Sequence, residues 1–180
     1  MKKKVTIPVK DSHRLVNAGA LALISASYEG SSTITPIAWH MPVSSNPKLF
    51  AAAFAHKRYS LELALASGCF CINIPGASLK EQVLICGKNS GRDMDKFKET
   101  GLTAVKCNKI PSLYVSECIA HIECSVTETF SAGDHTIVIG MAVDAYSDES
   151  LLTDKGIIDI ENFEPLHHLG GVHFAALKKI

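Results

Sequence analysis

The chain has 180 residues, of which 47% are hydrophobic and 20% charged, and its 18 basic residues balance its 18 acidic ones. This composition is typical of a globular protein, and the balanced charge excludes a general attraction to nucleic acid or to a membrane surface. The longest apolar runs, such as residues 19–24 and 61–66, are too short to span a bilayer. The basic residues 1–4 precede an apolar run at residues 5–9 that is too short for a signal peptide. We therefore expect a single cytoplasmic domain over residues 1–180, without nucleic-acid or membrane partners.

The first half of the chain predicts strands joined by turns, with one short helix. A short segment that could be helical, residues 13–17, precedes strands at residues 21–28 and 33–40, which the turn at residues 29–32 joins as a hairpin. Pro36 lies within the second strand, which indicates an edge strand or a bulge. A loop at residues 42–48 is expected next. It leads to a strand at 49–55, a helix at 60–66 and a strand at 69–74.

The second half predicts one more helix and the clearest strands. Ser78 and Glu81 have the spacing of a capping box for a helix that ends near residue 86. A long strand is expected from about residue 114, because alternate residues differ in polarity. One of its faces carries Cys118, Ala120, Ile122, Cys124 and Val126; the other carries Glu117, His121, Glu123, Ser125 and Thr127.

A turn at residues 133–135 leads to the next expected strand, residues 136–146. Its alternation places one set of apolar residues on a single side: Ile137, Ile139, Met141 and Val143. Residues 147–161 are expected to form an exposed excursion, and residues 172–177 a last short strand. About seven strands with antiparallel turns and two or three short helices predict a mainly β (α+β) fold, a closed or nearly closed barrel. No GxGxxG, GxxxxGK[ST] or GxSxG motif occurs, which argues against a Rossmann domain, a P-loop nucleotide hydrolase and an α/β-hydrolase.

The six cysteines do not form a CxxC motif, and no Cys/His spacing matches a structural zinc site. Cys69 and Cys71 flank Phe70 in an expected strand and so share one face, as Cys118 and Cys124 do in theirs. We interpret all six as buried free thiols and expect no metal.

The most unusual stretch of the chain is SGRDMDKF at residues 90–97. Ser90 and Asp93 are spaced like a helix-capping pair, so a helix is expected from Arg92 to about residue 100, ending at Gly101. Arg92 and Lys96 would then share a face. Two cations beside a helix N-terminus could hold a phosphate. The alternative is a solvated surface helix with internally paired charges.

Six stretches together carry a family resemblance: TPIAWHMPVS at 35–44, KRYS at 57–60, FCINIP at 70–75, SGRDMDKF at 90–97, GDH at 133–135 and PLHHLGG at 165–171. They resemble the flavin reductase-like family, and within it the flavoredoxin-like branch. The resemblance implies an FMN-binding split β-barrel of Greek-key antiparallel strands. It also implies a homodimer with FMN near the subunit interface.

The resemblance also implies which residues bind the flavin ring and its phosphate. Trp39 could line the ring pocket, or be a core or interface aromatic. His40 and Met41 would meet the ring edge. The phosphate would bind to cations, hydroxyls and N–H groups at a helix start, or else these residues only introduce the helix: Lys57, Arg58, Tyr59 and Ser60. Related proteins often have Asn and Thr where this chain has Thr33 and Ser60.

Two further groups complete the implied site. Within SGRDMDKF, Lys96 would reach the flavin, whereas Arg92 would either reach it or hold the loop by pairing with Asp93 or Asp95. His135 is the candidate catalytic residue, either donating to the flavin or touching an incoming nicotinamide; the alternative is an ordinary turn histidine. His167 and His168 could close the pocket from the partner subunit.

These residues imply an FMN-binding oxidoreductase, an NAD(P)H-dependent flavin or ferric reductase that takes hydride onto FMN and passes electrons onward. One alternative is a flavoredoxin-like carrier that exchanges electrons with a redox-protein partner and has no NAD(P)H activity of its own. Another is a non-enzymatic dimer that binds a flavin.

Overall fold

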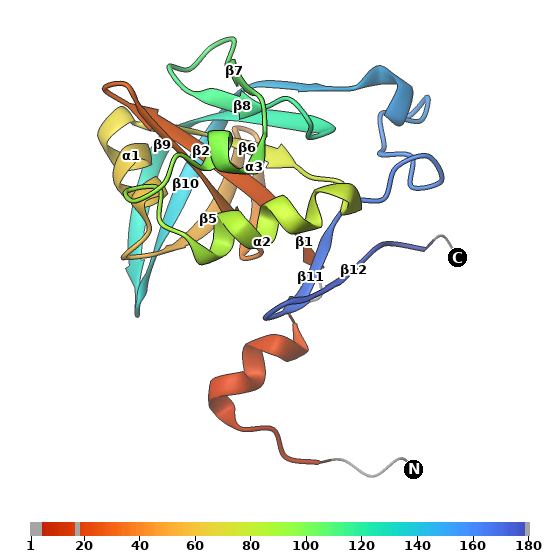
Figure 1. Cartoon of the computed structure of the whole chain (residues 1–180). Coiled ribbons are helices and arrows are strands. Elements are labelled where there is room, and N and C mark those ends of the chain that lie inside the picture. The colour runs from red at the N-terminus through yellow and green to blue at the C-terminus, as the bar shows by residue number, and fades with distance from the viewer. Residues whose placement is uncertain (1–4, 17–18, 179–180) are drawn as a thin grey trace.

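The computed structural model describes residues 5–16 and 19–178 (Figure 1). The basic start at residues 1–4 and the end of the expected helical segment at residue 17 lie outside them. Within the described residues, a 3-10 helix η1 spans Val9–Leu15, so the local helix begins earlier than expected. No helix in these ranges is both long and apolar enough to cross a membrane.

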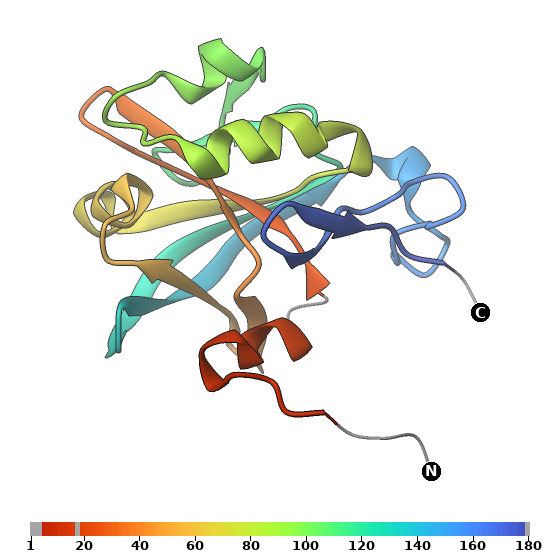
Figure 2. The same cartoon turned by 60° about the horizontal axis from the view of Figure 1, so that its bottom comes forward.

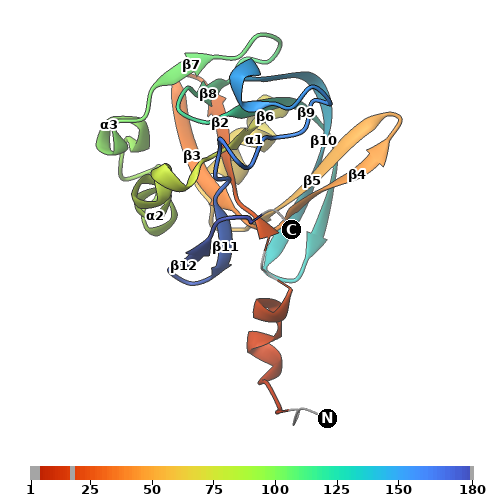
Figure 3. The ribbon, with the colours of Figure 1, turned by 90° about the vertical axis from the view of Figure 1, so that its right-hand side faces the viewer.

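One antiparallel sheet of seven strands forms the body of the protein, in the order β3-β2-β6-β9-β10-β5-β4. Its strands are β2 (Ala22–Tyr28), β3 (Ser31–Ile37), β4 (His40–Ser45), β5 (Lys48–Ala55), β6 (Cys69–Ile74), β9 (Ala120–Ala132) and β10 (His135–Ser147). The sheet curls so that its two edges approach each other (Figure 3). Where β3 passes into β4, the Ala53 N–H donates to the Trp39 carbonyl oxygen at 2.9 Å, which continues the pairing of β4 with β5. The mainly β, antiparallel prediction is confirmed.

Two small sheets and three helices surround this body. The smaller sheets pair β11 (His167–Gly170) with β1 (Gly19–Ala20) and β12 (His173–Ala175), and β7 (Ala104–Lys106) with β8 (Leu113–Val115). The helices are α1 (Tyr59–Ser67), α2 (Lys80–Lys88) and α3 (Lys96–Thr100), with 3-10 turns η2 (Ala77–Leu79) and η3 (Glu149–Leu151). Figure 2 shows α2 lying across the strands, with the β11–β12 hairpin beside it.

The core has two main parts, which explains why strands β2 and β6 are apolar on both faces. Inside the curled sheet, Phe54, Phe70 and Val138 pack with the apolar residues of α1. On the opposite face, Leu23 and Ile34 pack under α2 and α3. Gly140 in β10 is required by this packing, because a Cβ there would lie 2.6 Å from Cζ of Phe70.

Several predicted elements differ from the structure. The expected loop at residues 42–48 is wrong: β4 pairs with β5 there, and the turn at Asn46–Pro47 joins them. The strand expected at residues 33–40 ends at Ile37, and Pro36 lies in edge strand β3 as predicted. The capping box at Ser78 and Glu81 does not form, because a 3-10 turn precedes α2 and its N-cap is Leu79, which makes no side-chain cap.

The long strand expected from residue 114 is divided into β8 and β9. Residues 113–115 pair with β7 instead, and the Ser116 N–H donates to the Thr103 carbonyl. Cys118 therefore packs under α2, whereas Cys124 lies inside the barrel, so the two do not share a strand face. Strand β11 was not expected. Its residues lack a long apolar alternation, and it is held by pairing with β1 and β12 on either side.

Candidate functional site

A cavity of about 220 Å³ lies where β3 ends, and we call it the strand-end cavity. Its walls come from residues 35–39 at the end of β3, from residues 53–55 of β5 and from His135 at the start of β10. Sheet register brings these segments together, because His135 pairs with Ala55. Three of the wall residues are alanines (Ala38, Ala53 and Ala55), which leave room for a flat ligand.

Two aromatic side chains lie on the rim of this cavity. The rings of Trp39 and His135 are 4.8 Å apart between centroids and inclined by 35°. Trp39 is 45% exposed, so it remains available to a ligand or to a partner surface. The ring of His13 in η1 makes an edge contact with Trp39, with the ring centroids 5.9 Å apart. Trp39 and His135, which the family resemblance assigns to the flavin site, therefore lie side by side on this rim.

The orientation of His135 is set by the preceding turn. Its Nδ1 lies 2.6 Å from Oδ1 of Asp134, and this hydrogen bond and the His135 charge lower the pKa of the Asp134 carboxyl. The carboxylate can only accept, so Nδ1 carries the proton of this hydrogen bond and Nε2 is the ring nitrogen left for other contacts. His168 also lines the cavity. Its Nε2 lies 3.1 Å from the Gly171 carbonyl oxygen and its ring contacts Phe174.

A second cavity, of about 230 Å³, adjoins the first, and Thr35 and Arg58 line both. We call it the cationic cavity, because four basic residues line it: Lys57, Arg58, Lys88 and Lys96. Arg58 is the N-cap of α1 and makes no side-chain cap, so the first-turn N–H groups of α1 lack a capping acceptor there. Its Nη1 donates to the Gly87 carbonyl oxygen at 3.0 Å, which joins the start of α1 to the end of α2.

Lys96 has a buried amine. Only 2% of the residue is exposed, and Nζ donates to the carbonyl oxygens of Ile34 at 2.8 Å and Cys86 at 2.7 Å. Burial lowers the pKa of the amine to about 8. Lys96 therefore ties α3 to β3 and α2, while also lining the cationic cavity. Its expected contact with the flavin stays a prediction.

The helix expected from Arg92 is wrong. It begins at Lys96, because the Asp95 carboxylate accepts from the Lys98 N–H at 3.2 Å and is the N-cap. Arg92 and Lys96 thus do not share a helix face. The C-terminal end at Gly101, in the left-handed conformation, is as predicted.

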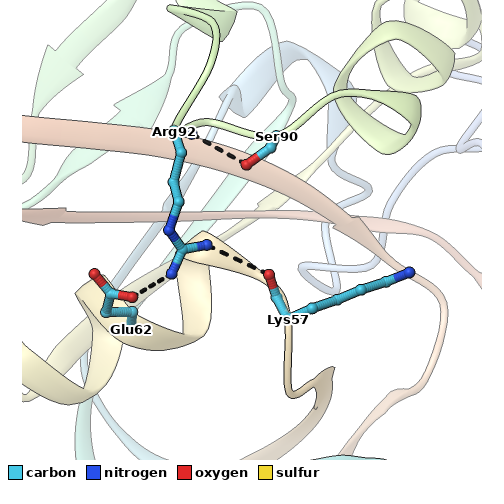
Figure 4. Close-up of polar contacts among 4 residues, drawn as sticks. All are labelled: Lys57, Glu62, Ser90 and Arg92. Carbon is cyan, nitrogen blue, oxygen red and sulfur yellow. Dashed lines mark hydrogen bonds and ion pairs between the residues drawn. The ribbon is translucent and has the colours of Figure 1, made fainter.

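Arg92 binds α1 rather than the acids of its own loop (Figure 4). Its guanidinium pairs with Glu62, donates to the Lys57 carbonyl oxygen at 3.4 Å and lies 4.8 Å from the centre of the Tyr59 ring. The expected pairing with Asp93 or Asp95 is therefore replaced by Glu62. The backbone N–H of Arg92 donates to Ser90 Oγ, as Figure 4 also shows. Arg92 holds the loop before α3 against α1.

Two buried hydroxyls close to these elements lack hydrogen-bond partners within the described part of the chain. Thr33 is 1% exposed, and its Oγ1 lies beneath Gly91, where an added Cβ would approach it to 2.1 Å. Ser60, in the first turn of α1, is fully buried with an unpartnered Oγ. Neither lines the strand-end cavity or the cationic cavity. An unsatisfied buried hydroxyl costs on the order of 1–3 kcal/mol, and such groups are typical of functional sites.

Two expected ring contacts lie elsewhere. His40 Nε2 lies 2.9 Å from the Ala20 carbonyl oxygen, and burial lowers the pKa of its ring. Met41 is exposed on the outer face of β4. Both line an apolar cavity of about 380 Å³ on the other side of Trp39, so they do not share the strand-end cavity.

The sequence reasoning missed part of the lining. Thr35, Ala53 and Ala55 received no role, although alanines cluster in AAAFA at residues 51–55 and could have indicated space beside a strand. Among the described residues, no group of three or more His, Cys, Asp or Glu side chains is placed to bind a metal.

The chain is similar to known proteins in both sequence and structure. The profile of a family described as "Flavin reductase like domain" matches residues 14–170. The chain is 30% identical to the uncharacterized protein YddH of Escherichia coli strain K12, over 99% of this chain and 97% of that protein. An uncharacterized protein of Archaeoglobus fulgidus is 33% identical over 57% of this chain, and the match spans 58% of that protein. The flavoredoxin of Desulfovibrio vulgaris (Miyazaki F) is similar in structure, with a TM-score of 0.87 and 26% identity, over 100% of this chain and 95% of that one.

Proposed function

This chain belongs to the flavin reductase-like domain family and has its split-barrel fold, and from this we propose that it binds FMN across the two adjoining cavities. The observation that carries the proposal is that an aromatic, alanine-lined cavity adjoins a cationic one, with Thr35 and Arg58 lining both. FMN has the same two parts, a flat ring and a phosphate.

The residues fit both parts of such a ligand. The ring would lie along residues 37–39 and 53–55, beside Trp39 and His135. The phosphate would bind Lys57, Arg58 and the open first turn of α1, where N–H groups and the helix dipole favour an anion. The unpartnered hydroxyls of Thr33 and Ser60 would supply further hydrogen bonds after a small movement of the loop. When bound, FMN supplies the electron-transfer chemistry; the chain orients it and controls access.

We favour an NAD(P)H-dependent flavin reductase as the activity. A further cavity of about 410 Å³, between α2 and β12, shares Arg58, His168 and Gly171 with the strand-end cavity. A second ligand could therefore bind beside the ring, and a donor nicotinamide held there would react by proximity and orientation. His135, fixed by Asp134, would orient that ligand through Nε2.

An electron carrier is the second candidate, and the likeness to a flavoredoxin over the whole chain favours it. A carrier would keep its FMN and exchange electrons with a redox protein at the exposed edge of the site. Trp39 is exposed at that edge and could form part of such a contact.

We also propose a homodimer. The outer face of β4, β9 and β10 carries exposed apolar side chains beside Trp39: Met41, Val43, Phe130, Met141 and Val143. Ile137 and Ile139 of β10 lie on the same outer face, because the register aligns Met41 with Ala51 and Ala51 with Ile139. Apolar faces of this kind mark interaction sites. A second copy seated here would lie next to the strand-end cavity.

FMN binding is tested with the chain's single tryptophan. Titration with FMN should quench the fluorescence of Trp39, and the Lys57→Gln/Arg58→Gln double variant should weaken binding at least tenfold. Lys106→Gln, an exposed lysine in β7, is the matched control and should bind like wild type. Unquenched fluorescence and a colourless purified protein would refute the flavin proposal.

Activity is then tested by anaerobic mixing of the FMN-loaded protein with NADH and with NADPH. Bleaching of the flavin by either one supports the reductase. Bleaching only by dithionite or by a reduced protein would refute the reductase and support the carrier. A flavin that neither exchanges electrons with a protein nor reacts with a nucleotide would indicate a non-enzymatic binder.

For the dimer, Met141→Glu should halve the mass measured by sedimentation; a wild-type monomer would contradict that proposal.

A further inference from the structure

Three cysteine thiols gather on one side of strand β6, away from the candidate flavin site. Cys69 and Cys71 are buried on the same face of β6, as their spacing predicted. Cys107, in the loop between β7 and β8, packs against them together with Ile110 and Tyr114. Cys107 is half-buried and so reaches solvent, whereas Cys69 and Cys71 do not. A reagent in solution would therefore meet Cys107 first.

A buried carboxylate holds the loop that carries Cys107. Glu123 of β9 is fully buried and accepts three backbone N–H groups of this loop, those of Asn108 at 2.6 Å, Lys109 at 2.7 Å and Ile110 at 3.2 Å. Charge-assisted bonds of this kind are among the strongest in proteins. Its other partner is the Tyr146 hydroxyl, at 3.0 Å. The position of Cys107 over β6 is therefore fixed by the fold.

The two buried thiols differ in their partners. The Cys69 thiol donates to Ser67 Oγ at 3.5 Å. The Cys71 thiol packs beside Cys107, and the neighbouring Cys107 thiol together with burial raises the pKa of Cys71. Cys71 thus stays protonated and unreactive toward oxidants on its own, but it is the neighbour that a modified Cys107 would meet.

We propose that Cys107 and Cys71 form an oxidation-sensitive thiol pair that closes to a disulfide when a peroxide reacts with Cys107. The Cys107 thiolate attacks a peroxide oxygen, the O–O bond breaks, and Cys107 becomes a sulfenic acid while hydroxide leaves and is protonated to water. The Cys71 sulfur then attacks the Cys107 sulfur. The S–O bond breaks and the hydroxyl leaves with the Cys71 proton as a second water. Two thiols lose two electrons, and one hydrogen peroxide becomes two waters.

A disulfide between Cys107 and Cys71 would change the structure around it, because the Cys71 thiol is part of a buried hydrogen-bond network. Its thiol donates to Asn73 Oδ1 at 3.7 Å, an atom that also accepts the Val115 N–H at 2.9 Å and lies 2.9 Å from His121 Nδ1. The disulfide would remove that thiol donor and join β6 covalently to the loop after β7. The β7–β8 hairpin and the β4–β5 hairpin lie on different sides of the barrel (Figure 3), so the inference does not depend on FMN binding.

The test uses the full-length reduced protein treated with hydrogen peroxide, alkylated and digested with trypsin. Trypsin places Cys107 in residues 107–109 and leaves Cys69 and Cys71 together in residues 59–80. Mass spectrometry should find these two peptides linked, with the loss of two hydrogens, and dithiothreitol should separate them. The matched variants Cys69→Ser and Cys71→Ser then decide which buried thiol reacts.

We expect Cys69→Ser to retain the link and Cys71→Ser to lose it. In Cys71→Ser the sulfenic acid at Cys107 should persist and be trapped by dimedone. Retention in Cys71→Ser with loss in Cys69→Ser would overturn the assignment of the pair. Sulfinic or sulfonic Cys107 without any link in wild type would overturn the proposal itself. If Cys71→Ser fails to fold, fragmentation of the linked wild-type peptides should find the alkyl group on Cys69 and the disulfide on Cys71; an alkyl group on Cys71 instead would overturn the assignment of the pair.

Discussion

Replacement of Lys96 by methionine should change how the stability of this protein depends on pH. The wild-type amine is 2% exposed and bonded to two carbonyl oxygens, and its pKa is about 8 instead of the ordinary 10.5. In the unfolded chain the amine regains its ordinary pKa. Between these two values the unfolded chain binds more protons than the folded one, so the stability of wild type rises with pH. Below about pH 8 the folded protein bears the full cost of burying the charge.

The size of this effect follows from the shift in pKa. One unit corresponds to about 1.4 kcal/mol, so the full contribution is about 3 kcal/mol, and most of it develops between about pH 7 and pH 10. Lys96→Met has no titrating group at this position and lacks that rise. At pH 7 the Lys96→Met variant loses the two hydrogen bonds of the amine, which lowers its stability, and it also loses the buried charge, which raises its stability. These effects oppose each other, so its stability there should lie within about 2 kcal/mol of wild type.

Urea denaturation at several pH values measures the difference. Other groups titrate over this range in both proteins, so the free energy of unfolding of wild type minus that of Lys96→Met isolates the amine. Lys98 is exposed and lies two residues after Lys96 in α3, so Lys98→Met is the matched control. Its free energy of unfolding should change with pH as that of wild type does. If the free energies of unfolding of wild type and Lys96→Met differ by the same amount from pH 7 to pH 10, the Lys96 amine is not a buried group with a lowered pKa.

Three further predictions concern the loop before α3 and the buried histidine. Gly91→Ala should displace this loop, because its Cβ would lie 2.1 Å from Thr33 Oγ1; FMN affinity measured by fluorescence should fall at least tenfold. Arg92→Gln should cost less than about 1 kcal/mol in urea denaturation, because the Arg92–Glu62 pair is exposed, yet limited proteolysis should cut the loop faster. Burial lowers the pKa of His121 to about 4. Its protonation therefore favours the unfolded chain, and stability should fall by about 3 kcal/mol between pH 6.5 and pH 4, a fall that His121→Gln should lack.

The sequence predicted the fold well wherever local patterns and packing agree. Strands at residues 21–28, 49–55, 69–74 and 136–146 have strong apolar or alternating patterns, and each lies where it was expected. The failures occur where pairing partners decide the outcome. Residues 40–45 lack a clear alternation and contain Pro42, yet they form β4 because β5 offers an unpaired edge. Residues 113–115 leave the long strand because β7 pairs with them.

The candidate site was predictable as a set of residues but not as an arrangement. Trp39, Arg58, His135 and His168 do share one cavity, and motif resemblance was sufficient to collect them. The positions of His40 and Met41 depend on where β3 ends, and that boundary was misplaced by three residues. Each step along a strand reverses the side chain, so a displaced boundary moves a residue to another face.

The two cations of SGRDMDKF illustrate why charge alone did not identify the anion site. Both already have partners within the protein: Lys96 donates to two carbonyl oxygens, and Arg92 contacts Glu62 and the Tyr59 ring. A ligand phosphate would have to compete with those partners. Among the described residues, no ion pair involves Lys57 or Lys88, and both line the cationic cavity. The motif therefore shapes the wall of the cavity, and the charge that attracts an anion comes mainly from the start of α1 and the end of α2. Neutralising Lys57 and Lys88 together should raise the Kd for FMN more than Arg92→Gln does, and equal effects in a fluorescence titration would contradict this division of roles.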